Sequence, residues 1–208
     1  MWALIEDNQI TKVIHHPQQI KINDTVYPAK IFTLWSNQER KNLGIYSVTV
    51  DNSNYKNPDY YNNGLQSFNF ANDEVVRVWA EATPKSLDDK LYTQIHADEN
   101  RIPSDKSIGD VMEIGIKNKK KNEVKKIASR LLGNTDWYVV KANEVEDYNV
   151  PENITTYRAD VRAKSNEMET IIDNCDNVDE IESLYIYSNT GTEDNPVMTR
   201  PLGEFPVL

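Results

Sequence analysis

Residues Val124 to Lys164 have the sequence VKKIASRLLGNTDWYVVKANEVEDYNVPENITTYRADVRAK, which contains the longest run of mutually consistent helix signals in the chain. Apolar residues recur at helical spacing from Val124 to Leu132, so we expect them to form one face of an amphipathic helix. Gly133 follows directly, and a glycine in the left-handed conformation commonly closes a helix. The pattern therefore predicts a helix that ends at Gly133.

A second helix is expected after a polar crossing. Pro151 suits a first helical position, because proline lacks the N–H that would be unpaired there. Behind it, Ile154, Tyr157 and Val161 recur at helical spacing. We expect the two apolar stripes to face each other in a helical hairpin, with Trp137 buried between the helices.

Two short patterns, R-LL---DW and YR--VR, follow one another within this segment. They resemble the tail-assembly chaperones of tailed bacteriophages, in which a helix ending in Leu-Leu leads to Asp-Trp and the next helix carries Tyr-Arg and a second Arg. The family usually has a tryptophan shortly before Tyr-Arg, where this chain has Ile154–Thr156, and many members are shorter. The matching positions are Arg130, Leu131, Leu132, Asp136, Trp137, Tyr157, Arg158 and Arg162.

The resemblance implies a non-catalytic phage protein that works through contacts with other tail or tail-fibre proteins. Such a protein acts either as an assembly chaperone or as a component retained in the virion tail. Six of the matching positions are the hypothetical protein-binding residues of this region: Leu131, Leu132, Trp137, Tyr157, Arg158 and Arg162. The alternative interpretation is an ordinary amphipathic hairpin without kinship to that family.

Composition limits the classes of partner. The 208 residues carry a formal net charge of −10. Nucleic acid and anionic membranes attract clustered positive charge, so neither is an expected partner. The single Cys175 excludes an intrachain disulfide. No secretory leader and no long apolar run is visible, so we expect folding in a host cytoplasm, with the virion tail as a final location.

Residues 1–84 are expected to form a β-rich N-terminal domain of antiparallel hairpins with one short helix, which makes the whole chain an α+β protein. Ser36 and Glu39 match a capping box and predict the start of the helix, and Gly44 predicts its end. The hairpins are predicted by three turn sequences between apolar runs: Asp7–Asn8, Asn23–Asp24 and Ala71–Glu74.

A long surface loop is expected from Asp51 to Gly64, which is dense in Asn, Asp and Tyr. Exposed tyrosine beside asparagine is good contact chemistry. An alternative function is therefore a carbohydrate- or host-surface-binding module that uses Tyr55, Tyr60 and Tyr61. The competing interpretation is that these rings fold back and cap a small core.

After the β-rich domain we expect a polar connection at 85–109 and a helical region at 110–184. The run IKNKKKNEVKK, from Ile116 to Lys126, has no aromatic residue that could stack on bases, and Glu123 interrupts it. It therefore predicts a solvated helix face or a contact with an acidic partner, and not a nucleic-acid site.

The last region, 185–208, is expected to be an extended tail, because three prolines are spaced through it. Leu202 and Phe205 are apolar side chains that a solitary tail would leave in water, so they are hypothetical anchors for a partner protein. The alternative is that these anchors fold back onto the β-rich domain.

No residue pattern indicates catalysis. His15 and His16 are neighbours in an expected strand, where side chains point to opposite faces, and His96 comes from a distant segment. Zinc needs three or four converging ligands. No glycine-rich phosphate loop or nucleophile elbow is present. We therefore expect that the protein is not an enzyme and that it binds neither a cofactor nor a metal ion.

Overall fold

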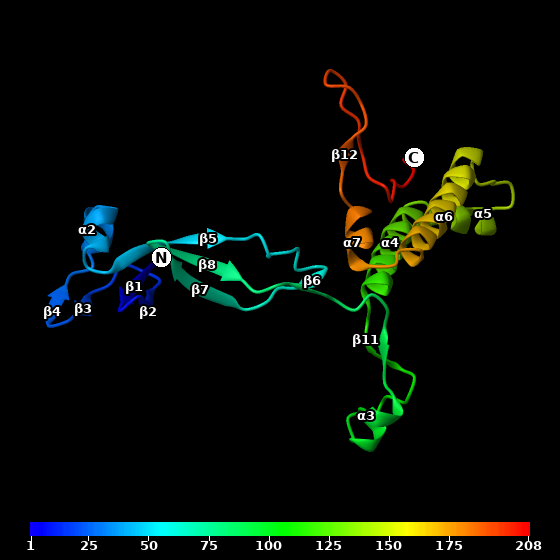
Figure 1. Ribbon diagram of the computed structural model, residues 1–208. Coiled ribbons are helices and arrows are strands. Elements are labelled where there is room, and N and C mark those ends of the chain that lie inside the picture. Colours follow the sequence, from blue (N-terminus) through cyan, green and yellow to red (C-terminus); the bar gives the residue numbers. More distant parts are fainter. The chain divides into compact units, whose positions relative to one another are not determined.

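A computed structural model describes residues 1–208, which divide into two compact units, Met1–Thr83 (unit 1) and Pro84–Leu208 (unit 2). Unit 1 is dominated by strands and unit 2 by helices (Figure 1). The chain is therefore an α+β protein, as its sequence predicts. The expected end of the β-rich domain at residue 84 lies beside the boundary between the units.

Unit 1 is built around a five-stranded sheet with the strand order β2-β1-β5-β8-β7. Its strands are β1 (Trp2–Glu6), β2 (Gln9–Ile14), β5 (Ile45–Asp51), β7 (Gln66–Ala71) and β8 (Glu74–Trp79). The hairpins β1–β2 and β7–β8 are antiparallel, as is the pair β1–β5, whereas β5 and β8 are parallel. The prediction of antiparallel hairpins alone missed this central pair, because a parallel pair is joined by a crossover and leaves no local turn signal.

The predicted turns close the hairpins. Asp7 and Asn8 have φ values of 51° and 62°, and Asn72 and Asp73 have 52° and 62°. Two successive residues with positive φ are typical of the type I′ turn, whose twist matches that of the flanking strands. A smaller hairpin, of β3 (Ile20–Ile22) and β4 (Thr25–Tyr27), turns at Asn23 with a φ of 53°.

Unit 1 has two short helices, α1 (Ile31–Leu34) and α2 (Asn37–Lys41), where one was predicted, and α1 contributes Ile31 and Phe32 to the main core. The capping box is confirmed: Ser36 N donates to Glu39 Oε2 at 2.8 Å, and Glu39 N donates to Ser36 Oγ at 3.2 Å. Gly44 has the expected left-handed conformation, with φ +77°. The buried members of this core are Leu4, Ile14, Ile20, Ile22, Ile31, Phe32 and Ile45.

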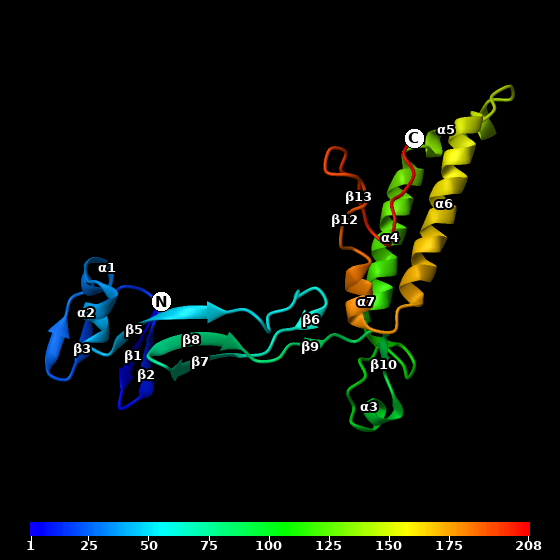
Figure 2. The same cartoon turned by 45° about the horizontal axis from the view of Figure 1, so that its top comes forward.

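Unit 2 is organised by two long helices, α4 (Ile116–Gly133) and α6 (Glu152–Asp173), which lie side by side (Figure 2). Their apolar stripes face each other as predicted, and Ala128, Tyr157 and Val161 form a buried cluster between them. Ion pairs flank the seam, with 2.7 Å between Lys121 and Asp173 and 3.2 Å between Lys125 and Glu169. The shorter helices are α3 (Gln94–Asp98), α5 (Asp136–Glu144) and α7 (Val178–Ser183).

The segment before α4 differs from the predicted connection and helix start. It contains α3 and a two-stranded pairing of β10 (Lys90–Leu91) with β11 (Val111–Glu113). A helix from Asp110 was expected, but α4 begins only at Ile116. Gly115 N donates to Asp89 Oδ1 at 2.7 Å, and a side chain at Gly115 would collide with the backbone of Asp88. The start of α4 is therefore set by this close contact, which the helix periodicity does not reveal.

The C-terminal segment folds back onto the helices of unit 2. It forms a small hairpin of β12 (Ser188–Asn189) and β13 (Met198–Thr199), and then Leu202 N donates to the carbonyl O of Leu184 at 3.1 Å. Leu202 is only 1% exposed, and Phe205 packs against the cluster between α4 and α6. The remaining short strands are β6 (Tyr61–Asn62) and β9 (Thr83–Pro84).

Candidate protein-binding site at the α4–α5 junction

Arg158, on α6, holds the junction between α4 and α5. Its Nη1 donates to the carbonyl O of Leu132 at 2.8 Å and to Thr135 Oγ1 at 2.6 Å, and its Nη2 lies 2.8 Å from Asp136 Oδ1. Thr135 Oγ1 donates in turn to the same Leu132 carbonyl at 2.9 Å. Arg158 thus satisfies a carbonyl at the open end of α4 and anchors the first residue of α5.

Helix α4 ends at Gly133, as predicted, but this network and not a left-handed glycine closes it. Gly133 is the last residue of the helix and does not have a left-handed conformation, and Asn134 follows with φ −61° and ψ −19°. Because Arg158 and Thr135 already satisfy the Leu132 carbonyl, no left-handed glycine is needed to close the helix.

The two halves of the phage-like pattern meet at this junction. Leu131 and Leu132 pack against the cluster that contains Tyr157, and Arg158 pairs with Asp136. Arg162 lies one turn further along α6, where its Nη1 donates to the carbonyl O of Arg158 at 3.2 Å. The spacing of the pattern is therefore accounted for by one local structure, in which each half supplies partners for the other.

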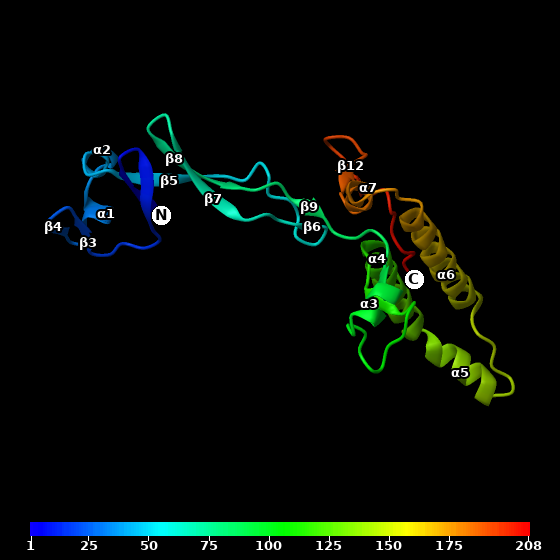
Figure 3. The ribbon, with the colours of Figure 1, turned by 60° about the horizontal axis from the view of Figure 1, so that its bottom comes forward.

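Trp137 is not buried between the helices, and that prediction is wrong. Its side chain is 52% exposed, and no residue of α5 is buried. Figure 3 shows α5 continuing beyond the end of α4, away from the seam with α6. The seam is already filled by Ala128, Tyr157 and Val161, with Phe205 packed against them. An indole therefore has no place there.

An open groove lies along one side of the α4–α6 seam and ends at the junction. Its volume is about 480 Å³. Leu132 and Ala128 supply apolar surface, whereas Lys125, Arg158 and Arg162 supply positive charge. Two of these cations are paired within the chain, Lys125 with Glu169 and Arg158 with Asp136. The groove can accept a segment that is apolar in part and carries a carboxylate.

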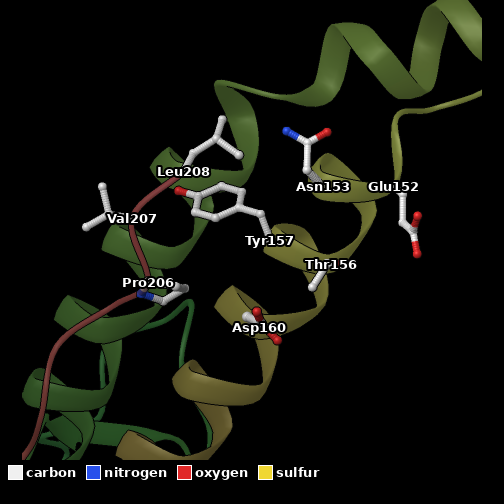
Figure 4. A pocket seen from close by; sticks show the side chains of 8 residues that line it. All are labelled: Glu152, Asn153, Thr156, Tyr157, Asp160, Pro206, Val207 and Leu208. Carbon is white, nitrogen blue, oxygen red and sulfur yellow. The ribbon is translucent and has the colours of Figure 1, made fainter.

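A second hollow lies on α6 beside the C-terminal end of the chain and has a volume of about 470 Å³ (Figure 4). Tyr157 points into it, next to Pro206, Val207 and Leu208.

The prediction of Leu202 and Phe205 as free anchors for a partner is wrong, because both are engaged within unit 2. The alternative prediction, that they fold back onto the β-rich domain, is also wrong.

The tyrosines of the 51–64 loop differ in exposure. Tyr60 and Tyr61 are buried, as the interpretation of a small capped core predicts. Tyr55 is exposed, and its ring lies against Trp79, with 5.0 Å between the centroids. The hypothesis of a glycan-binding surface assumed three exposed rings, and only one of them is available on the surface.

The lysines of the basic run have acidic neighbours. Lys117 donates to the carbonyl O of Asp173 at 3.0 Å, and Lys121 reaches the carboxylate of the same residue. Lys120 pairs with Glu123 at 2.9 Å. A part of the positive charge is therefore neutralised by the fold.

The structure offers few reactive groups. Cys175 is buried, and burial raises the pKa of its thiol, which disfavours the nucleophilic thiolate. His15 and His16 are exposed. No group of three or more His, Cys, Asp or Glu side chains is placed to hold a metal ion.

Comparison with protein-family models, with curated proteins and with solved structures found no match to this chain. No helix has the length and apolar character required to cross a membrane. The fold and the site define an α+β protein of two units, whose second unit presents an exposed helix next to a charged groove.

Proposed function

We propose that this chain is a non-catalytic tail protein of a tailed bacteriophage, which works by protein–protein contacts during assembly of the tail or tail fibre. The observation that carries the proposal is the large surface that the chain leaves uncovered. Its accessible surface is 13818 Å². Two separate globules of the sizes of units 1 and 2 would expose about 11,900 Å².

The excess over two separate globules is about 1,900 Å², whereas one partner in a standard interface covers about 800 Å² of its own surface. A protein that several neighbours cover in an assembly needs such a surface. The excess area therefore supports an assembly role with more than one contact.

One source of this surface is the segment 90–114 (the 90–114 arm), in which no side chain is buried. The arm still exposes aliphatic side chains of a kind that usually lies inside a protein. Figure 1 shows α3 and β11, which belong to this arm, extending away from α4 and α6. The exposed aliphatic residues are Leu91, Ile95, Ile108, Val111, Met112 and Ile114.

A second source is the segment 186–199 (the 186–199 hairpin), whose side chains are all exposed. An isolated two-stranded hairpin is at best marginally stable in water, and three or more strands or a covering element are needed for independent stability. A neighbouring protein that covers the hairpin would supply that element. Its exposed apolar residues are Ile186, Tyr187, Val197 and Met198.

The resemblance of the 130–162 region to tail-assembly chaperones supplies the phage assignment. The ion pair of Asp136 with Arg158 and the packing of Leu132 against the cluster that contains Tyr157 support it, because they give the pattern a structural reason. Host cytoplasm during assembly, and the virion tail if the protein is retained, are the corresponding locations.

The test uses a phage from which the gene for this chain has been deleted, with the protein supplied from a plasmid. We expect the deletion to prevent complete tails, as seen by electron microscopy, and the wild-type protein to restore them. The double variant Ile95→Asp, Met112→Asp should fail to restore tails, since it adds charge to the apolar surface of the 90–114 arm.

The matched control is Asn100→Asp with Ser104→Asp, which adds the same charge to exposed polar positions of the same arm. It should restore tails. Normal tails in the deleted phage would contradict the proposal. Mass spectrometry of purified particles against infected-cell lysate then separates a retained component from a transient chaperone.

A further inference from the structure

The α4–α6 pair lacks a third element on one side of its seam. Phe205 of the C-terminal segment packs against the cluster between the helices. The groove that ends at the α4–α5 junction is open, and no segment of this chain occupies it. Its lining runs along α6 from Arg158 to Asn166, which corresponds to about 12 Å at the helical rise of 1.5 Å per residue.

Helix α5 has the converse property, because the chain leaves most of its surface uncovered. It spans nine residues, about 13 Å, and none of them is buried. Trp137, Val140 and Glu144 are spaced by three and four residues, so they lie on one face of the helix. Helices this short are not stable in water without packing. The exposed face of α5 therefore needs a cover of about the length that the groove has.

We infer that α5 of a second copy of this chain lies in the groove, and that the exchange is reciprocal in a twofold-symmetric dimer. The inference does not rest on the proposed function. Figure 3 shows α5 continuing past the end of α4. From Asp136, α5 therefore runs in one direction, and the groove runs in the opposite direction, back along α4. A twofold axis at this junction places each α5 over the groove of the other copy, and the contact occurs twice.

The two surfaces then match residue by residue. Trp137, near the axis, meets Leu132 of the second copy, and Val140 meets Ala128. Glu144, about 12 Å from the axis, meets Lys125, which lies about the same distance along α4. Lys125 is exposed, and its ion pair with Glu169, at 3.2 Å, leaves it able to bind a second carboxylate.

Charge supports this orientation. The end of α5 that reaches Lys125 is followed by Glu146 and Asp147, so three carboxylates lie within four residues. The partial negative charge at the C-terminal end of α5 adds to them. The chain as a whole has a net charge of −10, whereas the groove lining holds three cations, Lys125, Arg158 and Arg162, against the one carboxylate of Asp136. Two acidic copies are thereby drawn together at this place.

The test is a charge exchange in the full-length chain, followed by sedimentation velocity from about 1 μM to about 300 μM, a range suited to small interfaces. Wild type should dimerise within this range. Glu144→Lys and Lys125→Glu should each raise the dimer dissociation constant about a hundredfold, because each creates two like-charge contacts per dimer. Trp137→Ser should abolish dimerisation, and circular dichroism should show that all three variants stay folded.

An equimolar mixture of the two charge variants decides the case. In a heterodimer the new lysine at position 144 of one copy meets the new glutamate at position 125 of the other copy. The unchanged Glu144 of the second copy meets the unchanged Lys125 of the first. Both contacts are attractive, so the mixture should dimerise about as well as wild type. Lys126→Glu and Glu193→Lys are the controls, since both positions are exposed and outside the proposed contact.

Three results would each overturn the inference. They are a wild-type protein that stays monomeric up to the highest concentration, a dimer that Trp137→Ser leaves intact, and a mixture that stays monomeric. None of these results bears on the test of the proposed function, which uses the deleted phage and variants of the 90–114 arm.

Discussion

Arg158 and Asp136 form an ion pair at 2.8 Å that joins the first turns of α6 to the first residue of α5. The same guanidinium closes α4 through the Leu132 carbonyl. One side chain therefore fixes where α4 ends and in which direction α5 leaves. The exposed position of Trp137 follows from it, because α5 is directed away from the α4–α6 seam.

Replacing Arg158 should destabilise unit 2. Its guanidinium is largely buried and donates to two oxygens besides the carboxylate of Asp136. Hydrogen bonds from a charged group contribute about 1.5–3 kcal/mol each to stability, so Arg158→Met should lower the free energy of unfolding by about 2–4 kcal/mol. Urea denaturation followed by helical circular dichroism measures this change. Arg162→Met, an exposed neighbour with one backbone contact, should change it by less than about 0.5 kcal/mol.

Trp137→Ala should leave the stability of the monomer nearly unchanged. The indole is half exposed and packs mainly on Tyr138, with 3.8 Å between the ring centroids, so its removal leaves no internal cavity. We expect a loss of less than about 1 kcal/mol. Met168→Ala is the comparison, because Met168 is buried on α6, and its loss should cost about 2–5 kcal/mol. Equal losses for the two variants, measured at low protein concentration, would contradict the exposed position of Trp137.

The hairpin β7–β8 should show a specific acid dependence through Asp73. Hydrogen bonds from Lys41 at 2.6 Å and from Tyr46 at 2.7 Å hold the pKa of Asp73 below its ordinary value of about 3.9. A lowered folded-state pKa means that the contact stabilises the fold above pH 3.9 or so and that this stabilisation is lost as the pH falls through the folded-state pKa.

The measurement for Asp73 is an NMR titration of its carboxyl carbon. Tyr46→Phe removes one donor, so the pKa of Asp73 should move up toward its ordinary value. The stability difference between wild type and Asp73→Asn should also disappear in acid. A pKa of Asp73 that is the same in wild type and in Tyr46→Phe would show that the hydrogen bond is absent in solution.

The C-terminal segment should contribute to the stability of unit 2. Leu202 is fully buried against the helices, so Leu202→Ala should lower the free energy of unfolding by about 2–5 kcal/mol. Val207 is 94% exposed, and Val207→Ala should have almost no effect. Thermal unfolding of both variants gives the comparison. A free tail would make the two substitutions equally harmless.

The basic run should not bind nucleic acid. Lys120 and Lys121 are paired with Glu123 and Asp173, and the protein around them is acidic. Changing Lys119, Lys120 and Lys121 to Gln should therefore leave DNA and RNA binding as weak as in wild type. The check is fluorescence anisotropy at several salt concentrations. An affinity that falls steeply with salt in wild type and vanishes in the triple variant would contradict this prediction.

Local chemistry determined much of this fold in advance. The turns at Asp7–Asn8 and Asn72–Asp73, the capping box of Ser36 with Glu39, and the apolar stripe of each long helix all depend on residues close in the sequence. Turn propensity, capping and amphipathic periodicity act over a few residues, so the sequence alone was enough to predict the α+β class and most of the elements.

Other features were decided only by the tertiary structure. The parallel pairing of β5 with β8, the exposure of Trp137 and the burial of Leu202 each depend on segments that are distant along the chain. The sequence shows which apolar residues are stabilised by burial. It does not show against which surface each of them packs, because the hydrophobic effect is non-directional. The seam between α4 and α6 accommodated Tyr157 and Val161 and left the indole outside. A protein interior is close-packed, so only some of the apolar side chains near α4 and α6 fit between these helices. Which of them fit is decided by the packed structure as a whole, and the sequence pattern does not reveal it.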